Sequence, residues 1–201
     1  DLLIMIHIPV LLNEVIAYLS PSNNDKIIDA TFGCGGHTKA ILRSCDTCSV
    51  LGIDRDPDVI SIANQLKELY KNRFEFIHGR FAVVLNSINN KYDKILFDFG
   101  VSSAQLDESE RGFAFSKDGP LDMRMSKSGL SAYDIINTFS QDDLAEIIWR
   151  YGDEQKSRAI SKAIVQNRKI HTINTTSQLR DIIISTIGNA VIHKQYSNIN
   201  V

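Results

Sequence analysis

Short apolar runs alternate with helix-period segments through the first hundred residues. Four runs rich in Ile, Leu, Val and Phe predict strands, and each is followed by polar or glycine residues: 26–30, 49–54, 74–77 and 94–97. Between them, apolar residues recur at helical spacing, as Val59, Ala63 and Leu66 do after Pro57. Strands that alternate with helices are typical of a parallel, doubly wound sheet. The sequence therefore predicts an α/β core.

The pattern changes after residue 97. The run Ile95–Phe97 is predicted to be a buried parallel strand, and a long polar, glycine-broken segment follows it, residues 98–125. Such loops are uncommon unless they bind something, and this one follows the carboxyl end of a strand, where α/β proteins bind ligands. Beyond it only helical stripes occur, at 132–139, 144–151, 159–164 and 179–187, with Ser140 as a plausible cap. We predict a core over residues 1–106, a helical module over 107–190 and a tail over 191–201.

The composition is that of an ordinary folded protein, with 43% apolar and 23% charged residues. A net charge of −2 gives no global attraction to nucleic acid or to an anionic membrane. Residues 150–181 carry seven basic and three acidic side chains, so this stretch is the better candidate for a local polyanion surface. A solvated helix surface explains the same excess and is favoured on composition alone.

Cysteine usage and hydropathy argue against several classes of protein. Cys45 and Cys48 have no second pair to complete a zinc site, so neither a metal site nor a redox motif is expected. The apolar opening 2–6 lacks the basic region and cleavage site of a signal peptide. No stretch approaches the roughly 18 apolar residues of a membrane span. The expected location is the cytoplasm, without a membrane partner.

A glycine loop, residues 29–37, joins the first strand to its helix and lets the backbone approach a ligand. Asp54, at the end of the second strand, can accept both hydroxyls of an adenosine ribose, although Asp54–Pro57 also suits a helix cap. The loop does not spell G-x-G-x-x-G, which disfavours NAD. Asp29 would repel a pyrophosphate but suits the amino group and sulfonium of S-adenosylmethionine. The residues indicate a nucleoside cofactor, with the methyl donor favoured.

Several long motifs resemble one family: Pro9–Glu14, Gly35–His37, Asp54–Pro57, Asp98–Ser103, Arg111–Phe113 and Asp118–Met125. From about His7 to Ile187 the chain resembles the bacterial small-subunit ribosomal RNA cytosine-N4 methyltransferases. The resemblance implies an S-adenosylmethionine-dependent enzyme with a Rossmann-like core and an inserted helical domain for substrate recognition. The implied reaction is methylation of N4 of a cytidine in the decoding centre. The implied partner is small-subunit ribosomal RNA or the small ribosomal subunit.

The resemblance also implies a set of cofactor contacts, which carry over position by position: Gly35, Gly36, His37, Asp54, Phe81, Asp98 and Gln105. Phe81 would cover an apolar face of the cofactor and Asp54 would bind the ribose. Asp98 and Gln105 would lie at the methionine end. The alternatives are core packing for Phe81 and a helix residue without a ligand for His37.

Asp98 is the candidate catalytic residue. Methyl transfer from a sulfonium is a displacement in which positioning matters most, and a carboxylate that accepts the N4–H hydrogen bond would direct the amine lone pair. The alternative is that Asp98 only holds the cofactor. Arg111 and Arg124 are candidates for the RNA backbone. They could equally fix their own loop through its acidic residues.

The chain departs from the family at its end. The family continues well beyond Gly188, and we expect this chain to lack that C-terminal part. We therefore expect an incomplete sheet with an uncovered edge, and marginal stability or self-association, for example as a homodimer. Smaller departures are Cys34, where the family usually has Arg, and Ser126, where it usually has Asp. A non-catalytic remnant that binds S-adenosylmethionine or RNA is the main alternative function, and a nicotinamide oxidoreductase is the third.

Overall fold

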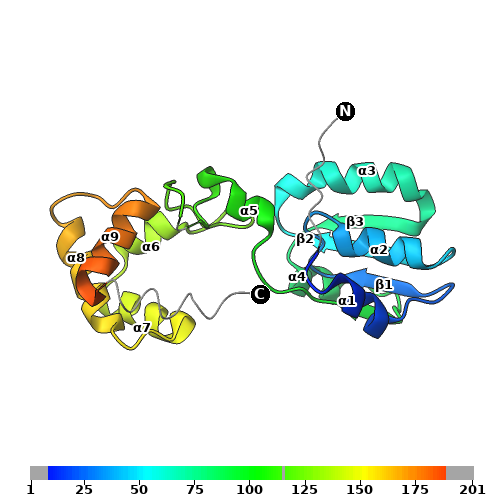
Figure 1. Ribbon diagram of the computed structural model, residues 1–201, viewed down its shortest axis with the longest axis horizontal. Helices are drawn as coiled ribbons and strands as arrows, with labels where there is room; N and C mark the ends of the chain where they lie inside the picture. Colours follow the sequence, from blue (N-terminus) through cyan, green and yellow to red (C-terminus); the bar gives the residue numbers. More distant parts are fainter. Residues whose placement is uncertain (1–8, 115, 189–201) are drawn as a thin grey trace. The chain divides into compact units, whose positions relative to one another are not determined.

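The computed structural model describes residues 9–114 and 116–188, and the chain divides into two compact units (Figure 1). The first unit runs to Ala104 and includes Met125–Lys127; the second contains Gln105–Arg124 and continues from Ser128. The predicted boundary, after residue 106, lies two residues beyond Ala104. The predicted tail, 191–201, lies outside the described residues. None of the described helices is both long and apolar enough to cross a bilayer.

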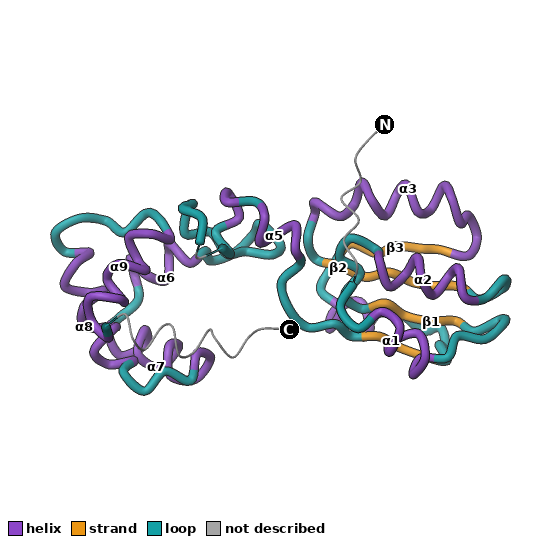
Figure 2. Tube along the Cα trace, in the orientation of Figure 1, coloured by secondary structure: helices purple, strands orange, loops and turns teal. Residues whose placement is uncertain are grey.

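The first unit is built on a parallel sheet of four strands in the order β3-β2-β1-β4 (Figure 2). The strands are β1 (Lys26–Asp29), β2 (Ser49–Asp54), β3 (Phe74–His78) and β4 (Lys94–Leu96). The predicted doubly wound α/β core is thus confirmed. Because β2 and β3 extend to one side of β1 and β4 returns to the other, the strand order reverses beside β1. The crevice at the carboxyl ends there is where such folds bind ligands.

Helices cover both faces of this sheet. They are α1 (Leu12–Leu19), α2 (Gly36–Ser44), α3 (Ile60–Tyr70) and α4 (Phe81–Ser87), with the short turns η1 (Pro57–Val59) and η2 (Lys71–Arg73). Ile27 points into the core under α2 and α3, and its neighbour Ile28 into the core under α4. Both faces are therefore apolar, which explains why β1 reads as a continuous apolar run. Sequence periodicity did not predict α1 or α4.

The expectation that the fourth strand is buried was wrong. Ile95 is 43% exposed and Phe97 is 37% exposed, although Leu96 packs against the core under α2 and α3. Among the described residues β4 pairs only with β1, so its outer edge is unpaired. The expected uncovered edge of the sheet is therefore present, and β4 forms it.

The cysteine pair also differs from expectation. Cys45 and Cys48, which were assigned no redox role, are joined by a disulfide. α2 ends at Ser44, and the turn that follows brings the two Cα atoms to 5.8 Å, within the usual range for such a bond. Within the described part of the chain, no group of three or more His, Cys, Asp or Glu side chains is placed to hold a metal ion.

The second unit is helical. After α5 (Ser103–Asp107), which begins in the first unit, it contains η3 (Ser109–Arg111), α6 (Ala132–Thr138), α7 (Gln141–Gly152), α8 (Ser157–Arg168) and α9 (Thr176–Ile187). The predicted stripes meet in a core that includes Leu144, Ile160 and Ile164. Ser140 caps α7 as expected, because its hydroxyl accepts from the Asp143 amide at 3.1 Å.

The unpaired edge predicts self-association of this chain. We expect sedimentation velocity to show oligomers of the wild type that grow with concentration, and Ile95→Lys to shift them toward monomer, because a lysine on an edge strand opposes edge pairing. Leu130→Lys, at an exposed apolar position of the second unit, is the matched control and should leave the distribution unchanged. A wild type that stays monomeric at all concentrations contradicts the prediction.

Candidate functional site

The candidate site begins with the loop that joins β1 to α2. The Gly33 amide donates a hydrogen bond to Asp54 Oδ2 at 2.7 Å, which ties the loop to the end of β2. The other oxygen of Asp54, Oδ1, accepts from the Asp56 amide at 2.9 Å. Each carboxylate oxygen can accept two hydrogen bonds, so both retain one acceptor position. Asp54 therefore organises the loop and can still bind a ligand.

The alternative role of this segment as a helix cap belongs to another residue. Asp56 is buried, and its Oδ1 accepts from the Asp58 amide at 3.1 Å at the start of η1. The capping function that the sequence left open for Asp54–Pro57 is thus carried out by Asp56. The Asp54 side chain is directed to the glycine loop instead.

The glycines of the loop are needed for different reasons. Gly35 has φ 72°, and a Cβ there would lie 2.8 Å from the Phe32 ring. A Cβ on Gly36 would lie 2.3 Å from Pro9 Cγ, so the proline packs directly on this backbone. Gly33 has φ 51°, and a Cβ there would approach only the Thr31 carbonyl oxygen, at 3.9 Å. The open side of the loop is therefore at Gly33.

Asp29 lies beneath the loop and is 1% exposed. Its Oδ2 accepts from the Thr38 hydroxyl at 2.7 Å, and its Oδ1 accepts from the Thr31 amide at 3.3 Å. Burial raises the pKa of the Asp29 carboxyl, and the hydrogen bond from Thr38 opposes that rise. From the sequence we expected this charge to lie directly against a cofactor. In the structure the carboxylate holds both ends of the loop from below.

His37 and Asp98 meet at the crevice between β1 and β4. His37 is buried, its Nε2 lies 3.2 Å from the Val10 carbonyl oxygen, and its Nδ1 lies 3.9 Å from Asp98 Oδ2. The Val10 carbonyl oxygen can only accept, so Nε2 is the donor in this contact, and Nδ1 is the ring nitrogen that faces Asp98. The Asp98 amide donates to the Thr31 hydroxyl at 2.7 Å, while the Asp98 side chain is 54% exposed. The backbone of Asp98 is thus fixed and its carboxylate is open to a ligand.

An aromatic cluster adjoins these residues. Phe81, the first residue of α4, has its ring centroid 5.3 Å from that of Phe97 and 6.1 Å from that of Phe99. Phe97 and Phe99 stack at 5.5 Å, and Phe99 is largely exposed. Phe81 also packs against the core under α4, so the core-packing alternative holds in part. Sequence reasoning missed Phe97 and Phe99, although both flank Asp98 in the chain.

Three of the predicted site residues belong to the second unit. Gln105 is buried in α5. Arg111 is 5% exposed, and its Nη2 donates to the Arg124 carbonyl oxygen at 3.2 Å. Arg124 Nη2 lies 2.6 Å from Asp122 Oδ2, and this pair lowers the pKa of Asp122. The arrangement of both arginines is the one expected if they fix their own loop.

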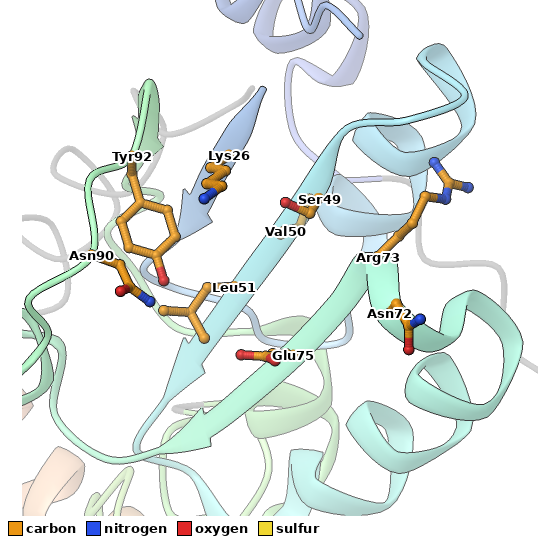
Figure 3. A pocket seen from close by; sticks show the side chains of 9 residues that line it. All are labelled: Lys26, Ser49, Val50, Leu51, Asn72, Arg73, Glu75, Asn90 and Tyr92. Carbon is orange, nitrogen blue, oxygen red and sulfur yellow. The ribbon is translucent and has the colours of Figure 1, made fainter. Parts of the chain in front are cut away.

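A separate hollow of about 150 Å³ lies at the amino ends of the strands (Figure 3). Lys26 and Ser49 line it from the starts of β1 and β2, Glu75 lines it from β3, and Tyr92 points its hydroxyl toward Leu51. Three charged side chains line it, Lys26, Arg73 and Glu75, and the Arg73 guanidinium donates to the carbonyl oxygens of Leu42 and Cys45. The remaining charges, Lys26 and Glu75, have opposite signs, so neither sign of ligand is favoured. None of the predicted site residues lines this hollow, which is distinct from the candidate site.

Known proteins are similar to this chain over most of its length. The model of the MraW methylase family matches residues 4–199. The ribosomal RNA small subunit methyltransferase H of Rickettsia bellii (strain OSU 85-389) is 50% identical over 183 residues, which are 90% of this chain and 60% of that protein. The protein of the same name from Rickettsia massiliae (strain Mtu5) is 48% identical over 92% of this chain and 61% of its own length. The chain thus spans about 60% of the length of these relatives.

The buried Asp29 predicts a pH-dependent stability difference. Because the folded-state pKa is raised, this carboxyl stabilises the fold fully below its unfolded pKa of about 3.9, and that contribution is lost as pH rises through the folded pKa. Asp29→Asn has no such titration. The unfolding free energy of Asp29→Asn relative to wild type should therefore increase as pH rises from about 4. Urea unfolding across pH measures it, and a pH-independent difference contradicts it.

Proposed function

The chain belongs to the MraW methylase family, and from that premise we propose that its first unit binds S-adenosylmethionine for methylation of small-subunit ribosomal RNA. The names of the relatives support the RNA substrate. Because the chain covers about 60% of those proteins, the activity of the whole enzyme is part of the proposal. The finer proposal, that the acceptor is N4 of a decoding-centre cytidine, rests on the resemblance of the motifs.

The observation that carries the proposal is the charge around the glycine loop. Asp29, Asp54 and Asp98 all lie at this end of the sheet, and His37 is the one basic side chain that the contacts above bring to them. A negative site suits a ligand with a sulfonium and an ammonium group, and it opposes a pyrophosphate. S-adenosylmethionine supplies a transferable methyl group on that sulfonium. The residues present therefore fit the methyl donor.

Each residue then has a distinct role. The free acceptor positions of Asp54 would bind the two ribose hydroxyls, and the open backbone at Gly33 admits the cofactor to the loop. Gly35, Gly36 and His37 form the start of α2 against which the ligand rests. The rings of Phe81, Phe97 and Phe99 supply the apolar side of the site. Gln105 remains a proposed contact at the methionine end.

Asp98 is proposed to act on the acceptor amine. The lone pair of an exocyclic cytosine amine is delocalised into the ring, so the amine is a weak nucleophile. A carboxylate that accepts one N–H would orient the lone pair toward the methyl group, which is a positioning effect. In this displacement the N–C bond would form as the S–C bond breaks, and the proton on the nitrogen would pass to the Asp98 carboxylate that accepts its hydrogen bond. The fixed backbone and exposed carboxylate of Asp98 suit this role.

For Arg111 and Arg124 we favour loop fixation over direct RNA contact, because one is buried and the other is paired with Asp122. The second candidate function is a non-catalytic remnant that binds S-adenosylmethionine or RNA. The observation that favours this second candidate is the edge of β4, which pairs with no further strand among the described residues. A nicotinamide oxidoreductase is disfavoured by the acidic loop.

Calorimetric titration of the 201-residue chain tests the cofactor proposal. We expect micromolar binding of S-adenosylmethionine and no binding of NAD. Asp54→Asn should weaken donor binding by about tenfold or more, because an amide cannot accept from both ribose hydroxyls while it holds the loop. Asp58→Asn, a nearby acid outside the site, is the control and should bind normally. Binding of NAD, or equal affinity in Asp54→Asn, contradicts the assignment.

Methyl transfer from labelled donor to small-subunit ribosomal RNA tests the role of Asp98. Asp98→Ala retains the backbone N–H that bonds Thr31, so the loop should stay in place. We expect this variant to keep donor binding, weakened by the loss of one of the three acidic charges at the site, and to transfer no methyl group. Full activity would rule out catalysis by Asp98, and loss of donor binding would reassign it to holding the cofactor. A wild type that binds donor and RNA without transfer indicates the remnant.

A further inference from the structure

A row of polar and basic side chains lies on the outer face of α8. Arg158, Lys162 and Gln166 lie in α8, and Lys169 is the residue that caps its C-terminus. All four are exposed, and their spacing of four, four and three residues places them along one side. The opposite face carries the buried residues Ser157, Ile160, Ser161 and Ile164. We call Arg158, Lys162, Gln166 and Lys169 the α8 ridge.

The basic residues of the ridge differ from the other basic residues of this stretch. Arg168 donates to the carbonyl oxygens of Ile136 and Phe139, and Lys156 Nζ lies 3.4 Å from the Ile187 carbonyl oxygen. Arg150 pairs with Glu146 at 3.7 Å and Arg180 pairs with Asp181 at 3.0 Å. Arg158, Lys162 and Lys169 make no ion pair or side-chain hydrogen bond with any residue of 9–114 or 116–188. The excess of positive charge that the composition indicated is therefore concentrated on the ridge.

Helix stability does not account for this arrangement. The positive end of the helix dipole lies at the N-terminus, where a cation such as Arg158 is disfavoured. Arg158 and Lys162 are like charges four residues apart, which also destabilises a helix. α8 contains no acidic residue, and Glu154, just before it, accepts from the Lys156 backbone amide at 2.7 Å. Only Lys169, at the C-terminal end, has a favourable dipole interaction.

We propose that the α8 ridge binds the phosphate backbone of the RNA substrate. Guanidinium and ammonium groups bind phosphates through charge-assisted hydrogen bonds, and the Gln166 amide adds a neutral donor. Along the helix axis, Lys162 lies about 6 Å from Arg158 and Lys169 lies about 16 Å from it. The ridge is therefore long enough to contact several phosphates. The ridge has no aromatic residue to stack on a base, so it positions RNA without reading its sequence. This inference rests on the proposed function, and it assigns RNA contact to a surface outside the cofactor unit.

Salt-dependent binding of the full chain to a small-subunit ribosomal RNA transcript tests the ridge. For the triple variant Arg158→Gln, Lys162→Gln and Lys169→Gln, we expect the slope of log affinity against log salt to fall by about two to three units. The control removes three paired cations instead, by Arg150→Gln, Arg180→Gln and Lys117→Gln, and should change the slope much less. Both variants should keep the wild-type affinity for S-adenosylmethionine. The ridge variant should melt at or slightly above the wild-type temperature, because it removes a cation from the N-terminus of α8 and a like-charge pair.

The outcomes separate this inference from the proposed function. An unchanged slope in the ridge variant, or an equal fall in the control, overturns the inference, as does a wild type that binds no RNA. Binding to anionic lipid vesicles in preference to RNA also overturns it. If the ridge variant loses salt-dependent RNA binding but the wild type binds no S-adenosylmethionine, the proposed function is wrong and the inference about the ridge is supported. If the wild type transfers methyl groups and the ridge variant binds RNA normally, only the inference about the ridge is wrong.

Discussion

The hydrogen bond from the Gly33 amide to Asp54 is the contact on which the candidate site depends. It joins the loop after β1 to the end of β2 and so determines which side of the glycine backbone stays open. Two further contacts complete the arrangement: Asp29 holds the loop from below through Thr38, and the Thr31 hydroxyl accepts from the Asp98 amide at the end of β4. Carboxylates and a hydroxyl thus connect three strands where the strand order reverses. In the function that we propose, the resulting negative charge favours a cationic ligand.

Much of this could be predicted from the sequence, for reasons that are local. The apolar runs gave the correct strands because each strand of a parallel sheet is covered on one or both faces. Ser140 was recognised as a cap because its partner, Asp143, is three residues away. Asp54 was singled out because the end of the second strand has a defined place in such folds; its hydrogen bond from Gly33 was not foreseen, and ribose binding stays a prediction. The resemblance to a methylase family rested on long motifs, and the family match over residues 4–199 confirmed it.

What could not be predicted depends on neighbours that are distant in the chain. Ile95–Phe97 reads as a buried strand, yet exposure depends on whether another strand lies beside β4, which the run itself does not encode. Asp29 is surrounded by Thr31 and Thr38, and only the fold of the loop shows that its carboxylate points into the interior. The basic residues of 150–181 look equivalent in sequence. Arg168 differs from Lys169 because its acceptors lie about thirty residues earlier, in α6 and at Phe139.

We propose that the two units divide the work. The first binds the methyl donor at a negative site, and the second binds RNA through cations of the α8 ridge that form no ion pair with the described residues. The methyl donor then binds at the open face of the loop that Asp54 holds. Backbone NMR of the full chain tests this at a single group, the Gly33 amide. We predict that this resonance shifts and exchanges more slowly on addition of S-adenosylmethionine, and that NAD leaves it unchanged. A Gly33 amide that does not respond to saturating S-adenosylmethionine, while resonances elsewhere in the chain shift, would show that the donor does not bind at this loop.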